Sequence, residues 1–500
     1  MLSEVDTRPF PGIPPQFNLA GHVLAGAQSR AEKPALVLLH NDRDEVLSYG
    51  ALLTLTRGAA TALTTLGLVP GDRVLLRLGN SLAFPVLFLA TLWAGLVPIP
   101  TSAALTTPEI TRLVPLVSPR VILAEPGIPL PDTRVPTLAP DLAKWAGLPS
   151  APLHLGDPER EAYVIFTSGT SGTPMAVSHA HRVILARSAM HHGWEGLTPE
   201  DRLLHAGALN WTYTLGTGLL DPWAVGATAL IPAAGAGPTT LPALLARAEA
   251  TIFAAAPGVF RQMLRAPFPS LPHLRHGLSA GESLSPALRD DWRRTTGTDL
   301  HEALGMSEIS TYVSGSPARP APAGTTGYVQ SGRHVALLGQ DNRPVPRGEA
   351  GELAVSIRDP GLMRGYLGQP TPSGLWFRTG DAAVMALDGA ITHLGRNDDL
   401  MNAGGFRVSP LEIEAAFDDL PGIAACAAAE VDITPGTRII ALFYESAFEL
   451  DPRLLRQRAE NILARWKQPR HYQRLDALPR TGNGKLIRRA LAAIFRKDDT

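Results

Sequence analysis

The chain has 500 residues, with 45 basic and 46 acidic side chains and a formal net charge of −1. At 45% hydrophobic and 18% charged residues it can bury large cores, so it is not a disordered chain, and its length predicts about two to four domains. The balanced charge argues against a dedicated nucleic-acid binder. The single cysteine, Cys426, excludes an intrachain disulfide framework and a cysteine-based metal site, and it fits a reducing cytoplasm.

The N-terminal segment MLSEVDTRPFPGIPPQFN carries acidic residues and no apolar core, so we do not interpret it as a signal peptide. Residues 82–100 contain no charge and are long enough to cross a membrane. Pro85, Pro98 and Pro100 interrupt this segment, however, and no basic cluster flanks it. The sequence therefore predicts a buried helix that runs into a buried strand of a soluble protein.

Apolar runs and stretches of helical periodicity alternate along the first 300 residues, which predicts an α/β fold with a mostly parallel sheet. Expected helices cover 82–96 and 107–117, and a proline-rich connector covers 126–158. Expected strands cover 72–79, 96–100, 120–125, 162–167, 227–232, 251–256 and 277–281. Residues 328–394 show shorter strands between glycine turns, so this part is expected to be richer in β-structure.

The character of the sequence changes near residues 395–405, where GRNDDLMNAGG is polar and glycine-rich and suits a hinge. Ser409, Pro410 and Glu412 then predict a helix start with a capping box. Strands at 425–431 and 438–444 and helices near 451–466 and 486–496 predict a small α+β domain. We expect a large domain at 1–397 and this small one at 398–500.

Residues 451–500 carry 13 basic and 5 acidic side chains. This excess fits either a solvated helix face or attraction to a polyphosphate ligand.

A loop rich in glycine and hydroxyl groups, Thr167 to Pro174, follows the expected strand at 162–167. Its two glycines allow successive backbone N–H groups to converge into an anion-binding nest. It is not a Walker A loop, because the glycines are too close together and no Lys-Ser/Thr pair follows. By itself this loop fits either a phosphate site or an ordinary connection.

Three further segments carry residues with possible chemistry. Lys485, one of five lysines, lies on a glycine-rich turn and could carry a point charge into a cleft or simply face solvent. Asp381, after Thr379 and Gly380, could accept from ribose hydroxyls or close an Asx turn. Glu308, in the segment Gly305-Met306-Ser307-Glu308, is a candidate ligand for Mg²⁺.

In their order and spacing these segments resemble the superfamily of adenylate-forming enzymes, which includes acyl- and aryl-CoA synthetases, adenylation domains of peptide synthetases and luciferases. The resemblance spans essentially the whole chain. It rests on FTSGTSGTP (166–174), AGES (280–283) with GMSE (305–308), RTGD (378–381), GRNDDLMNAGGFRVSPLEIE (395–414) and RTGNGK (480–485). Within the superfamily, PPQFNLAGHVL (14–24), LNWTYTLGTGL (209–219) and SAGESLSPALRDDW (279–292) resemble benzoate-type CoA ligases.

The resemblance implies a large N-terminal domain, a small mobile C-terminal domain, and a role for each matching residue. Mg²⁺ would be held by Glu308, the α-phosphate would contact Ser307, and the ribose would contact Asp381 and Arg396. Gly281 and Glu282 would lie beside the adenine. The β- and γ-phosphates of ATP would be held by Thr167, Ser168, Gly169, Thr170, Ser171 and Gly172.

The resemblance also implies roles in the acid and thiol chemistry. Lys485 would bridge the acid carboxylate and the α-phosphate. Asp398 would be the hinge of the C-terminal domain, and Gly405 and Arg407 would lie on the face used for thioester formation with CoA. The acid pocket would be lined by Thr212, Tyr213, Gly281 and Leu304.

The sequence departs from the family pattern at two positions. The phosphate loop normally ends Pro-Lys-Gly, whereas here it reads Pro174-Met175-Ala176, so the lysine expected at the outer phosphates is missing. The aromatic residue that often stacks on adenine is replaced by Leu304, as tends to be the case in benzoate-type ligases.

The resemblance implies an ATP- and Mg²⁺-dependent cytoplasmic ligase that joins a carboxylic acid to CoA through an acyl-adenylate. Trp211 and Tyr213 favour an aryl, cyclic or short-to-medium acid. Two alternatives stay open: transfer of the acyl group to a carrier protein, and a non-catalytic nucleotide-binding relative, which the absence of lysine at Met175 would motivate.

Overall fold

The computed structural model describes residues 1–500 except 11, 168–173, 404–405, 435–436, 481–484 and 496–500. Side chains are also not described at 402–403, 406–407, 434 and 437. The described strands form six sheets, and no described helix is long and apolar enough to cross a membrane.

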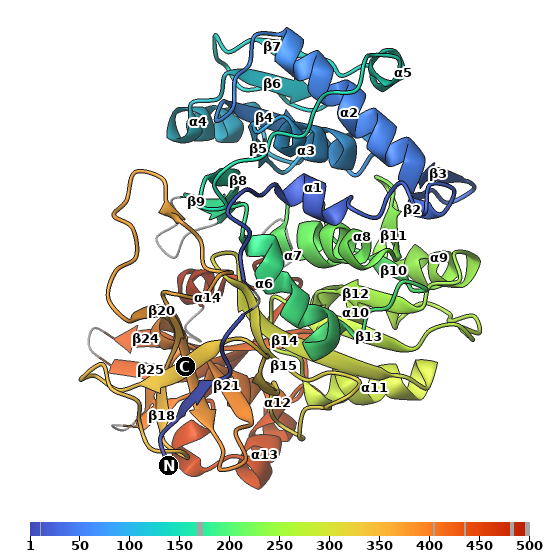
Figure 1. The fold of residues 1–500 in the computed structure, drawn as a ribbon. Coiled ribbons are helices and arrows are strands. Elements are labelled where there is room, and N and C mark those ends of the chain that lie inside the picture. The colour runs from blue at the N-terminus through green and yellow to red at the C-terminus, as the bar shows by residue number, and fades with distance from the viewer. Residues whose placement is uncertain (11, 168–173, 404–405, 435–436, 481–484, 496–500) are drawn as a thin grey trace.

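A nine-stranded sheet forms the centre of the molecule (Figure 1). Six of its strands are parallel, and antiparallel strands close both edges. In spatial order the strands are β16 (Tyr328–Val329), β15 (Ser310–Ser314), β14 (Asp299–Met306), β13 (His276–Ala280), β12 (Ile252–Ala255), β10 (Arg202–His205), β11 (Thr228–Pro232), β2 (Pro34–Leu39) and β3 (Asp44–Ser48). This sheet confirms the expected parallel α/β core.

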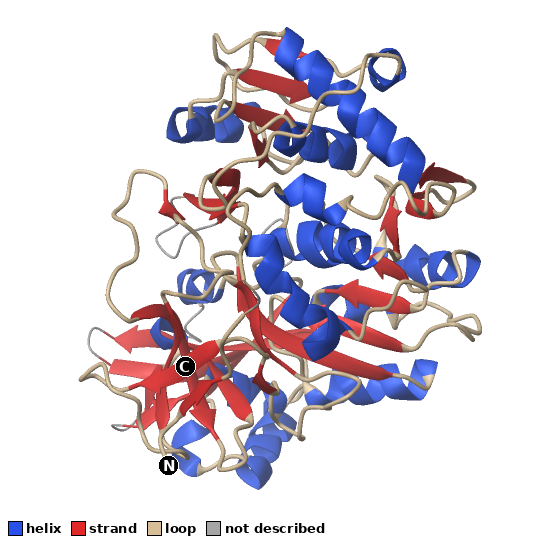
Figure 2. Cartoon of the chain, viewed as in Figure 1, coloured by secondary structure: helices blue, strands red, loops and turns tan. Residues whose placement is uncertain are grey.

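Helices cover both faces of this sheet (Figure 2), as a parallel sheet requires. One face packs around Phe253 and Trp292 against α9 (Leu241–Arg247), α10 (Pro257–Met263) and α11 (Pro286–Thr296), with the short η3 (Pro238–Thr240) before α9. The other face packs against α1 (Leu19–Val23), α6 (Val183–Met190), the π-helical turns η1 (His191–Glu195) and η2 (Gly216–Leu220), α7 (Thr212–Leu215) and α8 (Asp221–Val225).

A second parallel sheet lies at the top of Figure 1, in the order β5 (Val97–Pro100), β4 (Arg73–Arg77), β6 (Val121–Ala124) and β7 (Thr137–Leu138). Its helices are α2 (Tyr49–Thr65), α3 (Ala83–Trp93), α4 (Thr107–Val117) and α5 (Leu142–Ala146). Helix α3 is almost completely buried and leads into β5. The interpretation of residues 82–100 as a buried helix followed by a buried strand is confirmed.

Two antiparallel sheets complete the N-terminal part. The predicted strand at 162–167 is β8 (Glu161–Thr167), which pairs with β9 (Met175–Ala180), and β9 pairs with β19 (Gly365–Tyr366). The β-rich part is a sheet in the order β1 (Glu4–Asp6), β17 (His334–Leu338), β18 (Ala350–Ser356), β20 (Trp376–Met385) and β21 (Ile391–Arg396).

The C-terminal part begins after η4 (Asn397–Asp399), within which the predicted boundary at 397/398 falls. It contains β22 (Met401–Ala403), β23 (Phe406–Val408), α12 (Pro410–Ala415), β24 (Ala425–Thr434), β25 (Thr437–Glu445), α13 (Pro452–Ile462), η5 (Arg465–Lys467), β26 (His471–Leu475) and α14 (Arg488–Ile494).

The predicted helix start at Ser409 is correct, but the predicted capping box is wrong. The Ser409 hydroxyl donates to the carbonyl of Leu394 at 2.6 Å instead of capping its helix, and Glu412 forms an ion pair with Lys467. Tertiary contacts therefore use the side chains that would have closed the box.

Candidate active site

The predicted site residues converge at the carboxyl ends of β13 and β14, where ligands commonly bind in parallel α/β sheets. Gly281 follows β13 with a φ of +97°, a conformation that favours glycine. A Cβ atom there would come within 2.9 Å of the Trp211 indole. Only a residue without a side chain therefore lets this ring lie against the loop.

Aromatic rings line the expected acid pocket beside Gly281. The Tyr213 ring makes edge contacts with His205, at 4.3 Å between ring centroids, and with Trp211, at 5.2 Å. The Tyr213 hydroxyl donates to the carbonyl of Leu278 at 3.1 Å, which fixes the ring across the end of β13. Burial lowers the pKa of His205 to about 3, so this wall of the pocket is uncharged at neutral pH.

Ser307 and Glu308 occupy the turn between β14 and β15. The Ser307 hydroxyl lies 3.1 Å from the hydroxyl of Thr212, which connects the turn to the pocket helix α7. The Tyr366 hydroxyl donates to Glu308 Oε1 at 2.8 Å. Burial raises the pKa of Glu308, while this hydrogen bond and the charges of Arg396 and Lys485 oppose the rise.

Asp381 and Arg396 face each other across β20 and β21, where they are partners in register. Arg396 Nη1 lies 3.4 Å from Asp381 Oδ1 and donates to the carbonyl of Thr379 at 2.7 Å. Burial works to raise the pKa of Asp381, but His393, Arg396 and Lys485 together lower it below its ordinary value. Asp381 is therefore a buried carboxylate anion, which suits an acceptor for hydroxyl donors.

The C-terminal part brings Lys485 to this site. The lysine charge helps to lower the pKa of Asp381 and opposes the rise in the pKa of Glu308, so one cation acts on two carboxylates from different sheets. Glu282 holds the segment in place, because its Oε1 accepts from the backbone N–H of Leu486 at 2.8 Å and lies 3.6 Å from Arg480 Nη1.

The surroundings of Glu308 fit a hard cation such as Mg²⁺. The residue is 7% exposed, and the Tyr366 hydroxyl donates to one of its carboxylate oxygens. A carboxylate offers oxygen atoms, which are the ligands that Mg²⁺ prefers and which it usually shares with substrate phosphates.

Several predicted site residues are not brought to the pocket or lie outside the described residues. Asp398 is exposed in η4. Thr167 ends β8 opposite Met175, and the adjoining phosphate-loop residues Ser168, Gly169, Thr170, Ser171 and Gly172 lie outside the described residues. The same holds for Gly405 and for the side chain of Arg407. Leu304 lies in β14 and packs partly buried against the core formed with β17 and β18.

Sequence reasoning missed Tyr366 and His393, which contact Glu308 and Asp381 directly. Tyr366 lies in a two-residue strand and His393 in an ordinary antiparallel strand. The sequence around them contained no signal of chemistry, because their role depends on which strands become neighbours.

Comparisons with known proteins agree with this architecture. The profile of the AMP-binding enzyme family matches residues 24–367, and that of the AMP-binding enzyme C-terminal domain matches residues 412–485. The benzoate–CoA ligase of Thauera aromatica is 28% identical, over 97% of this chain and 97% of that protein. The human mitochondrial acyl-coenzyme A synthetase ACSM2A is 26% identical, over 96% of this chain and 91% of that protein.

Solved structures share the fold over nearly the whole chain. The benzoate CoA ligase from Burkholderia xenovorans LB400 superimposes with a TM-score of 0.84 at 25% identity, covering 95% of this chain and 100% of that one. The anthranilate CoA ligase AuaEII has a TM-score of 0.88 at 24% identity, covering 96% and 98%. The predicted fold class, a large α/β domain with a small C-terminal domain, is confirmed, and the chain belongs to the AMP-binding, adenylate-forming enzymes.

Proposed function

We propose that this protein is an acid–thiol ligase that converts a carboxylic acid, ATP and CoA to an acyl-CoA, AMP and pyrophosphate through an acyl-adenylate. The observation that carries the proposal is the position of Lys485, whose charge acts on both Glu308 and Asp381. This influence supports a role for the cation where a carboxylate and a phosphate would have to approach each other.

In the first half-reaction, a carboxylate oxygen of the acid attacks the α-phosphorus and pyrophosphate leaves. Negative charge increases on the phosphoryl oxygens, so positioning and charge neutralisation are the main catalytic needs. We assign Lys485 to the α-phosphate and the acid carboxylate, Ser307 to the α-phosphate, and Asp381 with Arg396 to the ribose. Glu308 would hold Mg²⁺, which supplies further neutralisation of the phosphates when bound.

Gly281 and Glu282 would lie along the adenine. The outer phosphates would rest on the loop that Thr167 begins. Met175 stands where a lysine would contact these phosphates, so their neutralisation would depend on backbone N–H groups, hydroxyls and Mg²⁺.

In the second half-reaction, the CoA sulfur attacks the acyl carbon, the carbon–oxygen bond to AMP breaks, and the thiol proton leaves to solvent. No lysine is needed for this step. We propose that residues 398–500 rotate about Asp398, which withdraws Lys485 and brings the face with Gly405 and Arg407 to the site.

We infer that the substrate is an aryl carboxylic acid. Trp211, Tyr213 and neutral His205 form a cluster of rings in edge-to-face contact, and Thr212 would lie beside it. Aromatic rings favour edge-to-face and offset contacts with such rings. The names of the relatives that act on benzoate also support this substrate class.

A panel of aryl, cyclic and short-chain acids tests the proposal, with AMP release measured in the presence and absence of CoA. We expect AMP release to require an aryl acid, to increase strongly with CoA, and to match acyl-CoA formation detected by mass spectrometry. AMP release that ignores CoA but responds to a phosphopantetheine carrier protein would favour the carrier-loading alternative. Absence of AMP release with every acid would contradict the proposal.

A further inference from the structure

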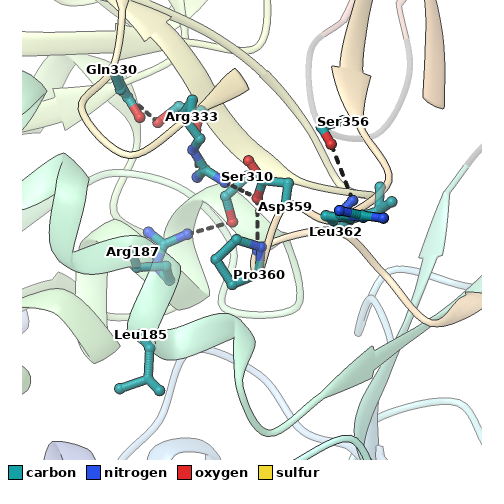
Figure 3. Close-up of polar contacts among 12 residues, drawn as sticks. Leu185, Arg187, Ser310, Gln330, Arg333, Ser356, Asp359, Pro360 and Leu362 are labelled. Atoms are coloured by element: carbon teal, nitrogen blue, oxygen red, sulfur yellow. Dashed lines mark hydrogen bonds and ion pairs between the residues drawn. The ribbon is translucent and has the colours of Figure 1, made fainter. Parts of the chain in front are cut away.

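Two buried guanidinium groups, those of Arg187 and Arg333 (Figure 3), contact the first residues of β15, directly after the turn that carries Ser307 and Glu308. Arg187, on α6, donates from Nη1 to the Ser310 hydroxyl at 2.8 Å. Arg333, just before β17, donates from Nη2 to the carbonyl of Thr311 at 2.9 Å. The two residues at the start of β15 are thus held by cations from two different parts of the chain.

Each of these arginines has its own buried aspartate. Arg187 donates to both carboxylate oxygens of Asp221, from Nε to Oδ1 at 2.8 Å and from Nη2 to Oδ2. Arg333 donates to Oδ1 of Asp359, which also accepts from the backbone N–H of Gly361. The side chains of both pairs are at most 6% exposed. Burying a charged pair carries a large desolvation cost, and apolar residues often give equal stability, so stability alone does not account for two such pairs at one turn.

The backbone of this turn is strained. Ser310 has a φ of +72°, in the left-handed region that non-glycine residues rarely adopt. A Cβ atom at Gly305 would come within 2.5 Å of the Ser310 carbonyl oxygen, so the two strands approach closely here. Such a conformation persists only where surrounding contacts fix it. The hydrogen bond from Arg187 is made to the strained residue itself.

The backbone approaches each guanidinium group closely. A Cβ atom at Gly216 would lie 2.2 Å from Arg187 Cζ, and one at Gly361 would lie 2.6 Å from Arg333 Nη1. Side chains at these two positions would displace the cations. The backbone is therefore shaped to bring both guanidinium groups against the turn.

The Arg187–Asp221 pair extends to two more buried groups. His191 Nε2 lies 3.5 Å from Asp221 Oδ1, and ligand atoms of His191, Glu195 and Asp221 all lie within 4.8 Å of one another. Burial, with Asp221 next to it, raises the pKa of Glu195, so Glu195 keeps its proton. Arg187 already donates to both carboxylate oxygens of Asp221. The cluster is therefore better suited to a protonated Glu195 than to a metal ion.

We propose that Arg187 and Arg333, each fixed by its aspartate, are positioning residues that hold Ser307 and Glu308 in place for the adenylation step. The proposal rests on the function proposed above. Neither arginine makes a described contact with the side chain of Ser307 or Glu308, so each acts through Ser310 and Thr311. The second half-reaction does not use Glu308 and should not depend on them.

The substitution Ser310→Gly separates this role from a purely structural one. Glycine adopts a positive φ without strain, so the protein should melt at the same temperature or higher. The anchor for Arg187 is lost, however, and misplacement of Glu308 should lower kcat for adenylation by about tenfold. Thioester formation from supplied acyl-adenylate and CoA should stay within about twofold of the wild-type rate. A structural role predicts instead that stability and both half-reactions change together.

The double substitution Arg187→Met with Asp221→Leu tests the pair without leaving a buried charge unpaired. We expect the same selective loss of adenylation, about tenfold or more. The matched control is Arg275→Met with Asp201→Leu. This pair also forms two hydrogen bonds, and it lies just before the amino ends of β13 and β10. Equal effects of the two double substitutions, or full adenylation by Ser310→Gly, would overturn the positioning role.

Failure of the proposed function is distinguishable, because the wild-type protein would then make no adenylate from any acid. The positioning role would fall with it.

Discussion

The N-terminal and C-terminal parts of the molecule contribute to the same site but are held in different ways. The N-terminal part contains extended apolar cores around its sheets, whereas the C-terminal part packs two small cores of its own. Described polar contacts between them include Glu282 with Arg480 and Leu486, and Arg261 with Asp418 at 3.9 Å. Polar contacts of this kind contribute little stability and break easily.

This difference agrees with the proposal that residues 398–500 rotate. Glu308 and Asp381 are positioned by strands of the N-terminal sheets, while the segment that carries Lys485 is attached to that part by polar contacts of Glu282. A site assembled in this way can lose its cation without unfolding, which suits an enzyme that needs the cation for only one of two steps.

The largest effect should come from removing the mobile cation. We expect Lys485→Ala to lower the adenylation rate by about 10²–10³ and to leave thioester formation from supplied acyl-adenylate nearly unchanged, because only adenylation needs the charge. Each half-reaction is measured separately. Lys467→Ala, which removes a lysine that pairs with Glu412 in the same part, serves as the control. Equal losses in both half-reactions would contradict the alternating role.

A rigid hinge should separate the two half-reactions. Asp398→Pro fixes φ in η4 and should restrict rotation, so one half-reaction should survive while the other falls by about tenfold or more. Asp399→Pro tests the neighbouring position. Normal rates for both steps in Asp398→Pro would show that this residue is not the hinge.

On the fixed side of the site, Tyr366→Phe removes the hydrogen bond to Glu308 and keeps the ring. We expect adenylation to fall by about tenfold and the Mg²⁺ concentration needed for half-maximal rate to rise, because the carboxylate loses its orientation. Tyr328→Phe, which removes the hydroxyl of a tyrosine whose ring lies under Arg319, is the control. An unchanged Mg²⁺ dependence would mean that Tyr366 does not orient the carboxylate.

The smallest effect should come from restoring the lysine absent at the phosphate loop. Met175→Lys should lower KM for ATP by roughly fivefold and leave kcat nearly unchanged, because one added charge-assisted contact is worth about 1 kcal/mol. Steady-state kinetics against ATP measure this. A wild-type protein that is inactive with every acid and gains activity from Met175→Lys would favour the non-catalytic interpretation of the natural chain.

The sequence predicted elements well where a pattern is local. Apolar runs located β4, β6 and β11, and the uncharged segment 82–100 was correctly interpreted as a buried helix and strand. The capping box at Ser409 failed because its hydroxyl is used by Leu394, a residue that the local sequence does not bring near.

The order of the motifs predicted which residues belong to the candidate site. It did not predict the contacts between segments that are distant in the chain. The two arginines behind the Ser307–Thr311 turn and the hydroxyl of Tyr366 come from elements far apart in the chain. No spacing rule connects such residues, since their meeting depends on tertiary packing.

We propose that the C-terminal part must move away from the N-terminal part between the two half-reactions. Linking the two parts covalently tests this directly. Arg261 and Asp418 face each other across the interface between the two parts. Both are replaced by cysteine after Cys426→Ala, and a short reducible reagent then links the two thiols. The account predicts that the linked protein adenylates its acid at nearly the wild-type single-turnover rate, forms no thioester, and regains thioester formation when the link is reduced. A linked protein that completes both steps would contradict it.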